Sequence, residues 1–182
     1  MKKYYLLFLV GIVCSIQPFA QDLSVEKIWK NYEFYAKGVD GFKSMKDGEY
    51  YTKPSEDLSI RKYKISTPND KGSILVDGTL LHFKGKQLQY DDYEFNSDET
   101  KILFMCDVES IYRRSFAASY YLYDIASKKL SALDEAHTPQ TLAEYSPDGK
   151  LVSYIHGNDL FVKNVVTGEI KKLTQDGKKN KI

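Results

Sequence analysis

Hydrophobic and polar residues alternate in short runs along most of the chain, from Gly48 onward. Alternating runs bounded by turn-forming pairs predict half-buried β-strands joined by tight hairpins. The turn-forming pairs are Asp47-Gly48, Asp77-Gly78, Lys84-Gly85, Asp148-Gly149, Thr167-Gly168 and Asp176-Gly177. No segment in this part sustains a helical period over about ten residues, so the pattern favours antiparallel hairpins over strand–helix–strand units.

One stretch before the strands follows a helical pattern instead. Within residues 23–34, four apolar residues recur at helical spacing: Val25, Ile28, Trp29 and Tyr32. Ser24 precedes them and is a favourable N-cap. The sequence therefore predicts one short amphipathic helix within a lead-in segment, residues 21–46, that precedes the strands.

The first 20 residues have the pattern of a secretory leader. Lys2 and Lys3 precede an apolar run over residues 4–13, and Pro18-Phe19-Ala20 ends on the small residue that signal peptidase requires. A membrane span needs roughly 20 apolar residues, and polar residues and a proline interrupt this run too early. We therefore expect cleavage near Ala20, a secreted or periplasmic mature chain and no membrane span.

Charge and cysteine content narrow the possible functions. The chain has 26 Lys and Arg against 25 Asp and Glu, or 24 against 25 once Lys2 and Lys3 leave with the leader. This balance argues against a nucleic-acid partner, which requires a broad basic face. Aromatic residues make up 14% of the chain, which suits pleated sheets. Cys14 lies in the leader, so Cys106, surrounded by apolar residues, is expected to be a core thiol.

Self-comparison shows a repeat. Residues 95–104 resemble 145–154, each reading as aromatic residue, turn and strand, and residues 122–133 resemble 162–173. Repeats of roughly 40–50 residues built from several antiparallel strands are typical of β-propeller blades. A weaker earlier unit surrounds Tyr63. The sequence thus predicts an all-β chain with about two to three blades; the alternative is a generic meander whose turns look alike.

The two matches differ in offset, 50 residues for the first and 40 for the second, so the earlier unit carries about ten extra residues. These fall within residues 109–118, which contain Arg113 and Arg114. Loops added to a rigid scaffold often carry binding groups, and a guanidinium can aim several donors at carbonyl or carboxylate oxygens. The alternative is a pair of solvated arginines, with Tyr112 and Phe116 as packing residues.

Familiar catalytic and cofactor motifs are absent from the sequence. There is no Gly-x-Ser-x-Gly, no nucleotide-binding glycine loop and no Cys-x-x-Cys pair. His82, His137 and His156 are too scattered along the chain to form a local metal motif, so we interpret them as ordinary surface or core histidines. Acid pairs such as Asp91-Asp92 and Asp98-Glu99 lie beside turns, where solvation explains them. No catalytic residue, metal ligand or cofactor is predicted.

Four segments resemble a known family. Residues 109–124, E-S-I-Y-R-R-S-F-A-A-S-Y-Y-L-Y-D, resemble the propeller domain of dipeptidyl peptidase IV enzymes, particularly bacterial secreted ones. Residues 142–149 and 158–163 continue the resemblance in order, and residues 23–29 are similar to the entry segment of that family. The Ser-Pro-Asp-Gly piece occurs in many propellers, whereas the arginine-bearing segment is far more specific.

The resemblance implies a serine exopeptidase that removes Xaa-Pro or Xaa-Ala dipeptides from the N-terminus of peptides. It implies an eight-bladed propeller with an α/β-hydrolase domain, and an arginine that contacts the substrate backbone carbonyl. Arg113, which follows the aromatic Tyr112, matches that arginine, whereas Arg114 matches a variable position. The expected partner is thus the N-terminus of a peptide substrate.

The family's paired glutamates and its Ser, Asp and His triad have no counterpart in the sequence. Eight blades of roughly 45 residues also need about 360 residues. We therefore expect residues 47–182 to be a partial propeller from a truncated dipeptidyl peptidase IV-like protein, inactive on its own and of undefined oligomeric state. The alternative is a non-catalytic secreted binding module with a propeller-like fold.

Overall fold

The computed structural model describes residues 23–36, 38, 41–67 and 71–179. The predicted leader and its cleavage site near Ala20 lie outside these residues. The chain forms two compact units, residues 1–38 and residues 39–182. No helix among the described residues is long and apolar enough to cross a membrane.

The first unit contains a helix that is shorter than predicted. Among the described residues of this unit, the helix is the single π-type turn η1, Glu26–Lys30. Its N-cap is Val25 rather than the predicted Ser24, although Ser24 Oγ accepts a hydrogen bond from Lys27 N at 3.2 Å. The chain leaves the helical conformation at Tyr32, whose φ is 52°. Trp29 is 72% exposed, so packing within the described part of this unit does not extend the helix.

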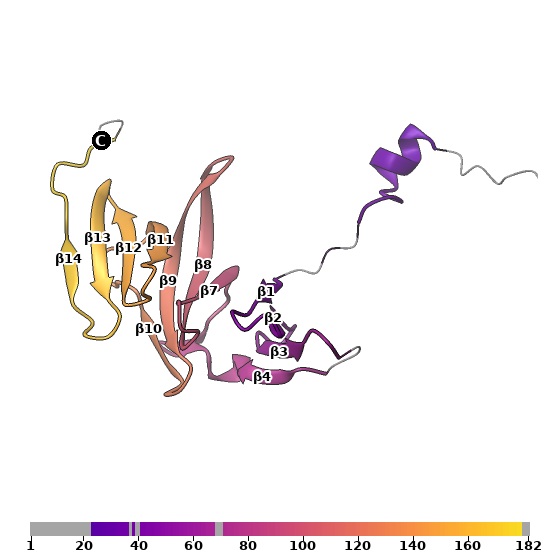
Figure 1. Cartoon of the computed structure of the whole chain (residues 1–182). Coiled ribbons are helices and arrows are strands. Elements are labelled where there is room, and N and C mark those ends of the chain that lie inside the picture. Colours follow the sequence, from indigo (N-terminus) through magenta and orange to yellow (C-terminus); the bar gives the residue numbers. More distant parts are fainter. Residues whose placement is uncertain (1–22, 37, 39–40, 68–70, 180–182) are drawn as a thin grey trace, which may run out of the picture. The chain divides into compact units, whose positions relative to one another are not determined.

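The second unit consists mainly of three four-stranded antiparallel sheets (Figure 1). Within each sheet the strands follow one another in chain order. The first sheet contains β1 (Lys43–Ser44), β2 (Tyr50–Pro54), β3 (Ile60–Lys64) and β4 (Ser73–Val76). The second contains β7 (Asp92–Phe95), β8 (Lys101–Tyr112), β9 (Ser115–Asp124) and β10 (Lys129–Ala132). The third contains β11 (Thr141–Tyr145), β12 (Leu151–His156), β13 (Asp159–Asn164) and β14 (Ile170–Lys172).

This arrangement confirms the predicted all-β fold and its repeat. Residues 95–104 and 145–154 both run from the first strand of a sheet into its second, and residues 122–133 and 162–173 both run from the third strand into the fourth. Tyr63 lies in β3, the third strand of the first sheet, as the weaker match required. The repeating unit is therefore a meander of four antiparallel strands, which occurs three times in succession. None of these sheets closes on itself.

Not every turn-forming pair closes a hairpin within a sheet. Asp77-Gly78 instead begins a short 3₁₀ turn, η2 (Gly78–Leu80), where the Asp77 side chain accepts a hydrogen bond from Thr79 N. This turn leads into a two-stranded ribbon of β5 (His82–Phe83) and β6 (Lys86–Gln87), which connects the first and second sheets. Asp176-Gly177 lies after β14. Both pairs follow the last strand of a sheet rather than reverse a strand within it.

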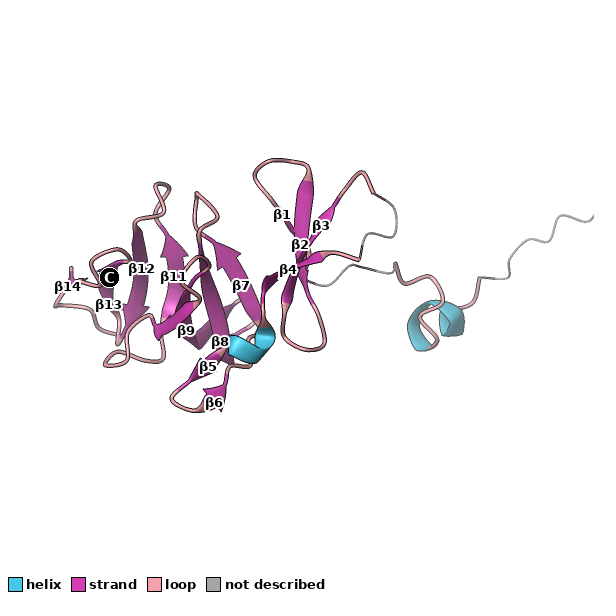
Figure 2. Ribbon diagram, turned by 90° about the horizontal axis from the view of Figure 1, so that it is seen from below, coloured by secondary structure: helices cyan, strands magenta, loops and turns pink. Residues whose placement is uncertain are grey.

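Two hydrophobic cores lie on opposite faces of the second sheet. Ile102 and Phe104 of β8 pack with Ile60 of the first sheet, whereas Leu103, the residue between them, packs with Tyr154 and Phe161 of the third sheet. Successive side chains of a strand point to opposite faces, so a strand between two sheets must be apolar on both sides. Figure 2 shows the second and third sheets face to face.

Polar contacts reinforce the packing of the first sheet against the second. The hydroxyl groups of Thr52 and Tyr93, both buried, lie 2.9 Å apart. Tyr93 also donates to Gly41 O at 3.1 Å, and the Lys43 ammonium lies 3.0 Å from the Asp92 carboxylate. Burial raises the pKa of Tyr93 to about 12, so its hydroxyl remains a hydrogen-bond donor at physiological pH.

Candidate functional site

The extra residues of the second sheet form the outer part of the β8–β9 hairpin. From Ile102 to Cys106 strand β8 is mostly buried within the sheet, but it continues to Tyr112 with exposed residues from Asp107 onward. The pairing register shifts between Cys106 and Glu109, where Asp107 has a φ of 52°. A bulge of this kind bends the strand and increases its twist, so it marks where the hairpin leaves the core. Figure 1 shows the hairpin extending beyond the neighbouring strands.

Arg113 and Arg114 form the two-residue tip of this hairpin, between β8 and β9. Both are exposed, and among the described residues no hydrogen bond or ion pair engages either guanidinium. Tyr112 is 75% exposed, so it does not pack into the core, whereas Phe116 packs against the core between the second and third sheets. The tip therefore presents ten N–H donors, five on each guanidinium, to whatever approaches it.

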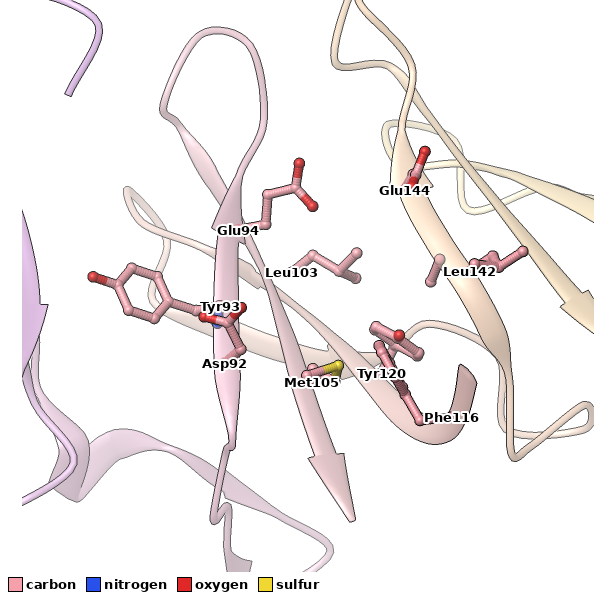
Figure 3. Close-up of a pocket in the computed structure, with 10 residues that line it drawn as sticks. Asp92, Tyr93, Glu94, Leu103, Met105, Phe116, Tyr120, Leu142 and Glu144 are labelled. Carbon is pink, nitrogen blue, oxygen red and sulfur yellow. The ribbon is translucent and has the colours of Figure 1, made fainter. Parts of the chain in front are cut away.

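A pocket of about 210 Å³ lies at the base of the hairpin (Figure 3). Three elements contribute to it: β7, the β8–β9 hairpin, and β11. Its apolar wall includes Met105, Phe116 and Tyr120 of the hairpin, and Glu94 and Glu144 lie on the strands at either side. Burial raises the pKa of Glu94, and the nearby charge of Glu144 raises it further. The pocket thus combines an apolar wall with three carboxyl groups, those of Asp92, Glu94 and Glu144, of which Asp92 forms an ion pair with Lys43.

The structure settles the environment of several other residues considered in the sequence. Cys106 is buried, and burial raises the pKa of its thiol to about 12, so it is a core thiol as predicted. Asp98 stabilises the turn between β7 and β8, because its carboxylate accepts hydrogen bonds from the Thr100 hydroxyl and the Thr100 N–H. Asp92, in contrast, forms an ion pair with Lys43 rather than being only solvated.

The three histidines do not share one environment. His82 is exposed in β5, far along the chain from the others. His137 and His156 are 19 positions apart in the sequence, yet their ring centres are only 5.5 Å apart. Sequence spacing could not reveal this pair, because the contact depends on how the β10–β11 loop folds over the end of β12. No group of three or more His, Cys, Asp or Glu side chains suited to a metal ion occurs in the described part of the chain.

Comparison with known proteins agrees with this architecture. Residues 96–182 match the model of the dipeptidyl peptidase IV N-terminal region. A Schizosaccharomyces pombe protein that carries the name of a dipeptidyl aminopeptidase is 34% identical over 128 residues, which is 67% of this chain and 16% of that protein. Dipeptidyl peptidase 4 of Trichophyton tonsurans is 32% identical over 136 residues, 74% of this chain and 16% of that protein.

A solved structure supports the same relationship. The crystal structure of Porphyromonas gingivalis dipeptidyl peptidase 4 superposes with a TM-score of 0.72 and 28% sequence identity, covering 88% of this chain and 23% of that one. Successive four-stranded antiparallel sheets with an arginine-tipped hairpin thus place the chain in the class of β-propeller proteins. The chain belongs to the dipeptidyl peptidase IV family, and it corresponds to part of the N-terminal region of that family. It spans about a sixth of the length of the curated relatives that it matches.

Proposed function

We propose that the chain is the N-terminal propeller portion of a secreted dipeptidyl peptidase IV-like serine exopeptidase. In this proposal the β8–β9 hairpin positions the N-terminal part of a peptide substrate, and Arg113 donates to a backbone carbonyl of that substrate. The chain itself contributes binding structure, whereas the nucleophile and its triad partners belong to a hydrolase domain outside this sequence. Secretion after cleavage near Ala20 is part of the same proposal.

The observation that carries this proposal is the unengaged Arg113 at the tip of a hairpin that departs from the repeat. A guanidinium packed into its own sheet would serve stability, but Arg113 is exposed and has no hydrogen bond or ion pair among the described residues. A two-residue tip on paired strands also restricts the backbone, which lowers the entropy lost when a substrate binds. Family membership supplies the kind of ligand, a peptide, and the hairpin supplies the donor.

A hairpin exchange tests the proposal. In the dipeptidyl peptidase 4 of P. gingivalis, the segment that aligns with residues 107–117 is replaced by the sequence of this chain. We expect the chimera to retain cleavage of a Gly-Pro reporter within roughly tenfold of the parent in kcat/KM, because tip geometry and donor are preserved. A matched chimera that carries Arg113→Ala is the control. If both chimeras have equal activity, the hairpin of this chain does not position substrate.

A further inference from the structure

The imidazole rings of His137 and His156 lie side by side, although the two residues come from different parts of the fold. His137 lies in the loop between β10 and β11, and His156 is the last residue of β12. Their ring centres are 5.5 Å apart, with an angle of 67° between the ring planes. The loop that carries His137 also contacts β9, because Thr138 lies beside Ser119 and Gln140 pairs with Ala118.

Each imidazole is held through its Nδ1 atom. His137 Nδ1 lies 2.8 Å from Asp134 Oδ2, and His156 Nδ1 lies 2.9 Å from Pro139 O. A carbonyl oxygen can only accept, so the proton of neutral His156 is on Nδ1 and the lone pair is on Nε2. The same assignment holds for His137 opposite an ionised carboxylate. No hydrogen bond within the described residues engages either Nε2 atom.

The carboxylate that accepts from His137, that of Asp134, is buried and held by further hydrogen bonds. Its side chain is 4% exposed, and it also accepts hydrogen bonds from the Tyr154 hydroxyl and from Ala136 N. These hydrogen bonds fix the position of the Asp134 carboxylate, and the carboxylate in turn fixes the orientation of the His137 ring.

The loop that carries His137 is fixed as well. Gln140, which is 1% exposed, donates through Nε2 to Asp134 O at 3.0 Å and to His137 O at 2.5 Å. The His137 ring packs on Phe161, with ring centres 4.5 Å apart. Restrained imidazoles lose little conformational entropy when they bind a ligand, so this arrangement is preorganised.

We propose that His137 and His156 together bind one divalent transition-metal ion of the zinc type through their Nε2 atoms. Zinc binds imidazole nitrogen at about 2.0–2.1 Å in a tetrahedral arrangement, which places two coordinated ring centres roughly 5.2 Å apart. The observed separation of 5.5 Å between the ring centres is close to this value. Metal-binding histidines also typically donate their other N–H to a carboxylate or a backbone carbonyl, as both do here.

Two protein ligands leave two positions of a tetrahedral ion for water or for a group on a partner. Imidazole nitrogen suits Zn²⁺, Ni²⁺ and Cu²⁺, whereas Mg²⁺ and Ca²⁺ prefer oxygen ligands. The site thus favours these transition-metal ions over Mg²⁺ and Ca²⁺.

The test is a Zn²⁺ titration of the full chain, purified without a histidine tag and stripped with a chelator, followed by calorimetry. We expect one Zn²⁺ per chain, with affinity at least about tenfold weaker in His137→Asn and in His156→Asn. His82→Asn is the matched control and should bind as the parent does, since His82 is exposed in β5. Equal affinity in all four proteins would overturn the proposal.

A second measurement avoids dependence on how the variants fold. In NMR spectra of the unaltered chain, Zn²⁺ should shift the ring-proton signals of two histidines together, and those of the third should not move. Assignment with the His82→Asn variant identifies the unaffected ring. Mg²⁺ at the same concentration should leave all three unchanged. Shifts confined to His82, or no saturable shift with Zn²⁺, would equally contradict the site.

Discussion

Arg113 and Arg114 are adjacent, carry the same charge and are both exposed, so charge and exposure do not distinguish them. In the P. gingivalis chimera, Arg113→Ala should lower kcat/KM by a factor that corresponds to a loss of roughly 1.5–3 kcal/mol in transition-state stabilisation. This is the scale of a lost charge-assisted hydrogen bond. Arg114→Ala should cost little. Steady-state kinetics on a Gly-Pro reporter measure both, and thermal melts should be equal because neither guanidinium has a partner within the described residues.

The substitution Arg113→Lys refines this prediction. A lysine retains the charge but has no planar fork of donors, so it should recover only part of the lost kcat/KM. Full recovery would mean that charge alone matters at the tip. If Arg114→Ala is the damaging change and Arg113→Ala is silent, the register of the family resemblance is wrong by one residue.

Asp124, at the end of β9, gives a prediction about acid stability. The Lys101 ammonium, which donates to Asp124 Oδ2, together with Ser127 N and Ser127 Oγ holds the pKa of this carboxyl well below its usual range. A pKa that is lower in the folded state than in the unfolded state stabilises the fold above the unfolded value, about 3.9, and this contribution is lost as pH falls.

Asp124→Asn should therefore lower the free energy of unfolding by about 1 kcal/mol at pH 7. The difference from the parent should shrink as pH falls below about 5, because the parent then loses the same interactions. Denaturant melts at several pH values measure this. Asp107→Asn is the control, since Asp107 is exposed and forms no ion pair within the described residues. A difference that does not depend on pH would contradict the prediction.

At the scale of elements, the first and third sheets end in the same way. After β4, Gly78 N donates to Ser59 Oγ at 3.0 Å, and after β14, Gly177 N donates to Asp159 Oδ1 at 3.0 Å. A Cβ atom on Gly78 would lie 2.1 Å from Asp57 O, and one on Gly177 would lie 2.1 Å from Asn158 O. Each glycine thus lets the chain that leaves the fourth strand cross closely over the turn between the second and third strands.

Gly78→Ala should consequently destabilise the second unit by about 1–3 kcal/mol, because the added methyl group overlaps backbone that cannot move freely. Gly177→Ala should do the same for the third sheet. Gly38→Ala is the matched control, since nothing lies within 4 Å of its added Cβ. Chemical denaturation monitored by tyrosine fluorescence measures the changes. If all three variants melt alike, the close crossing does not contribute to stability.

The second sheet lacks this crossing for a reason that is visible in the sequence. Its β8–β9 turn is displaced to Arg113–Arg114, and Leu133 and Asp134 follow β10 where the other sheets have their glycine. In place of the crossing, Ala118 of β9 pairs with Gln140. Residue offsets alone located this insertion correctly. They could not show that it lengthens two paired strands, because pairing depends on the register that forms across the hairpin.

Local pattern predicted most of the strands, and it was wrong where tertiary contacts decide. Four of the six turn-forming pairs close hairpins, whereas Asp77-Gly78 and Asp176-Gly177 end sheets, a difference set by the distant turns that these glycines approach. The helix predicted over residues 23–34 is reduced to Glu26–Lys30, because spacing of apolar residues stabilises a helix only where a surface covers that face. The role of Arg113 stays a prediction from the sequence.

At the scale of the whole molecule, the sites arise from packing between sheets that no single segment encodes. The pocket at the base of the hairpin combines Glu94 of β7 with Glu144 of β11, which are 50 residues apart. The His137 and His156 pair likewise depends on a loop of one sheet meeting a strand of the next. Neither glutamate stood out in the sequence, and the two histidines, 19 residues apart, formed no local motif. The packing of the second and third sheets and the fold of the β10–β11 loop bring these residues together.

The last prediction concerns how the isolated chain behaves in solution. None of its sheets is closed, and the third sheet leaves apolar side chains exposed, with Leu142 at 65%, Leu173 at 48% and Ile170 at 38%. Open sheet edges and apolar faces favour non-specific pairing between chains. Purified residues 21–182 should therefore form aggregates that grow with protein concentration, as measured by size-exclusion chromatography with light scattering over a concentration series. The titrations and denaturation experiments above use protein below the concentration at which this occurs. Leu142→Lys and Ile170→Lys should reduce the aggregation, since charge on an open sheet opposes such pairing. A single defined oligomer that melts cooperatively would instead indicate a self-contained binding module, because assembly of copies around an axis would cover these faces.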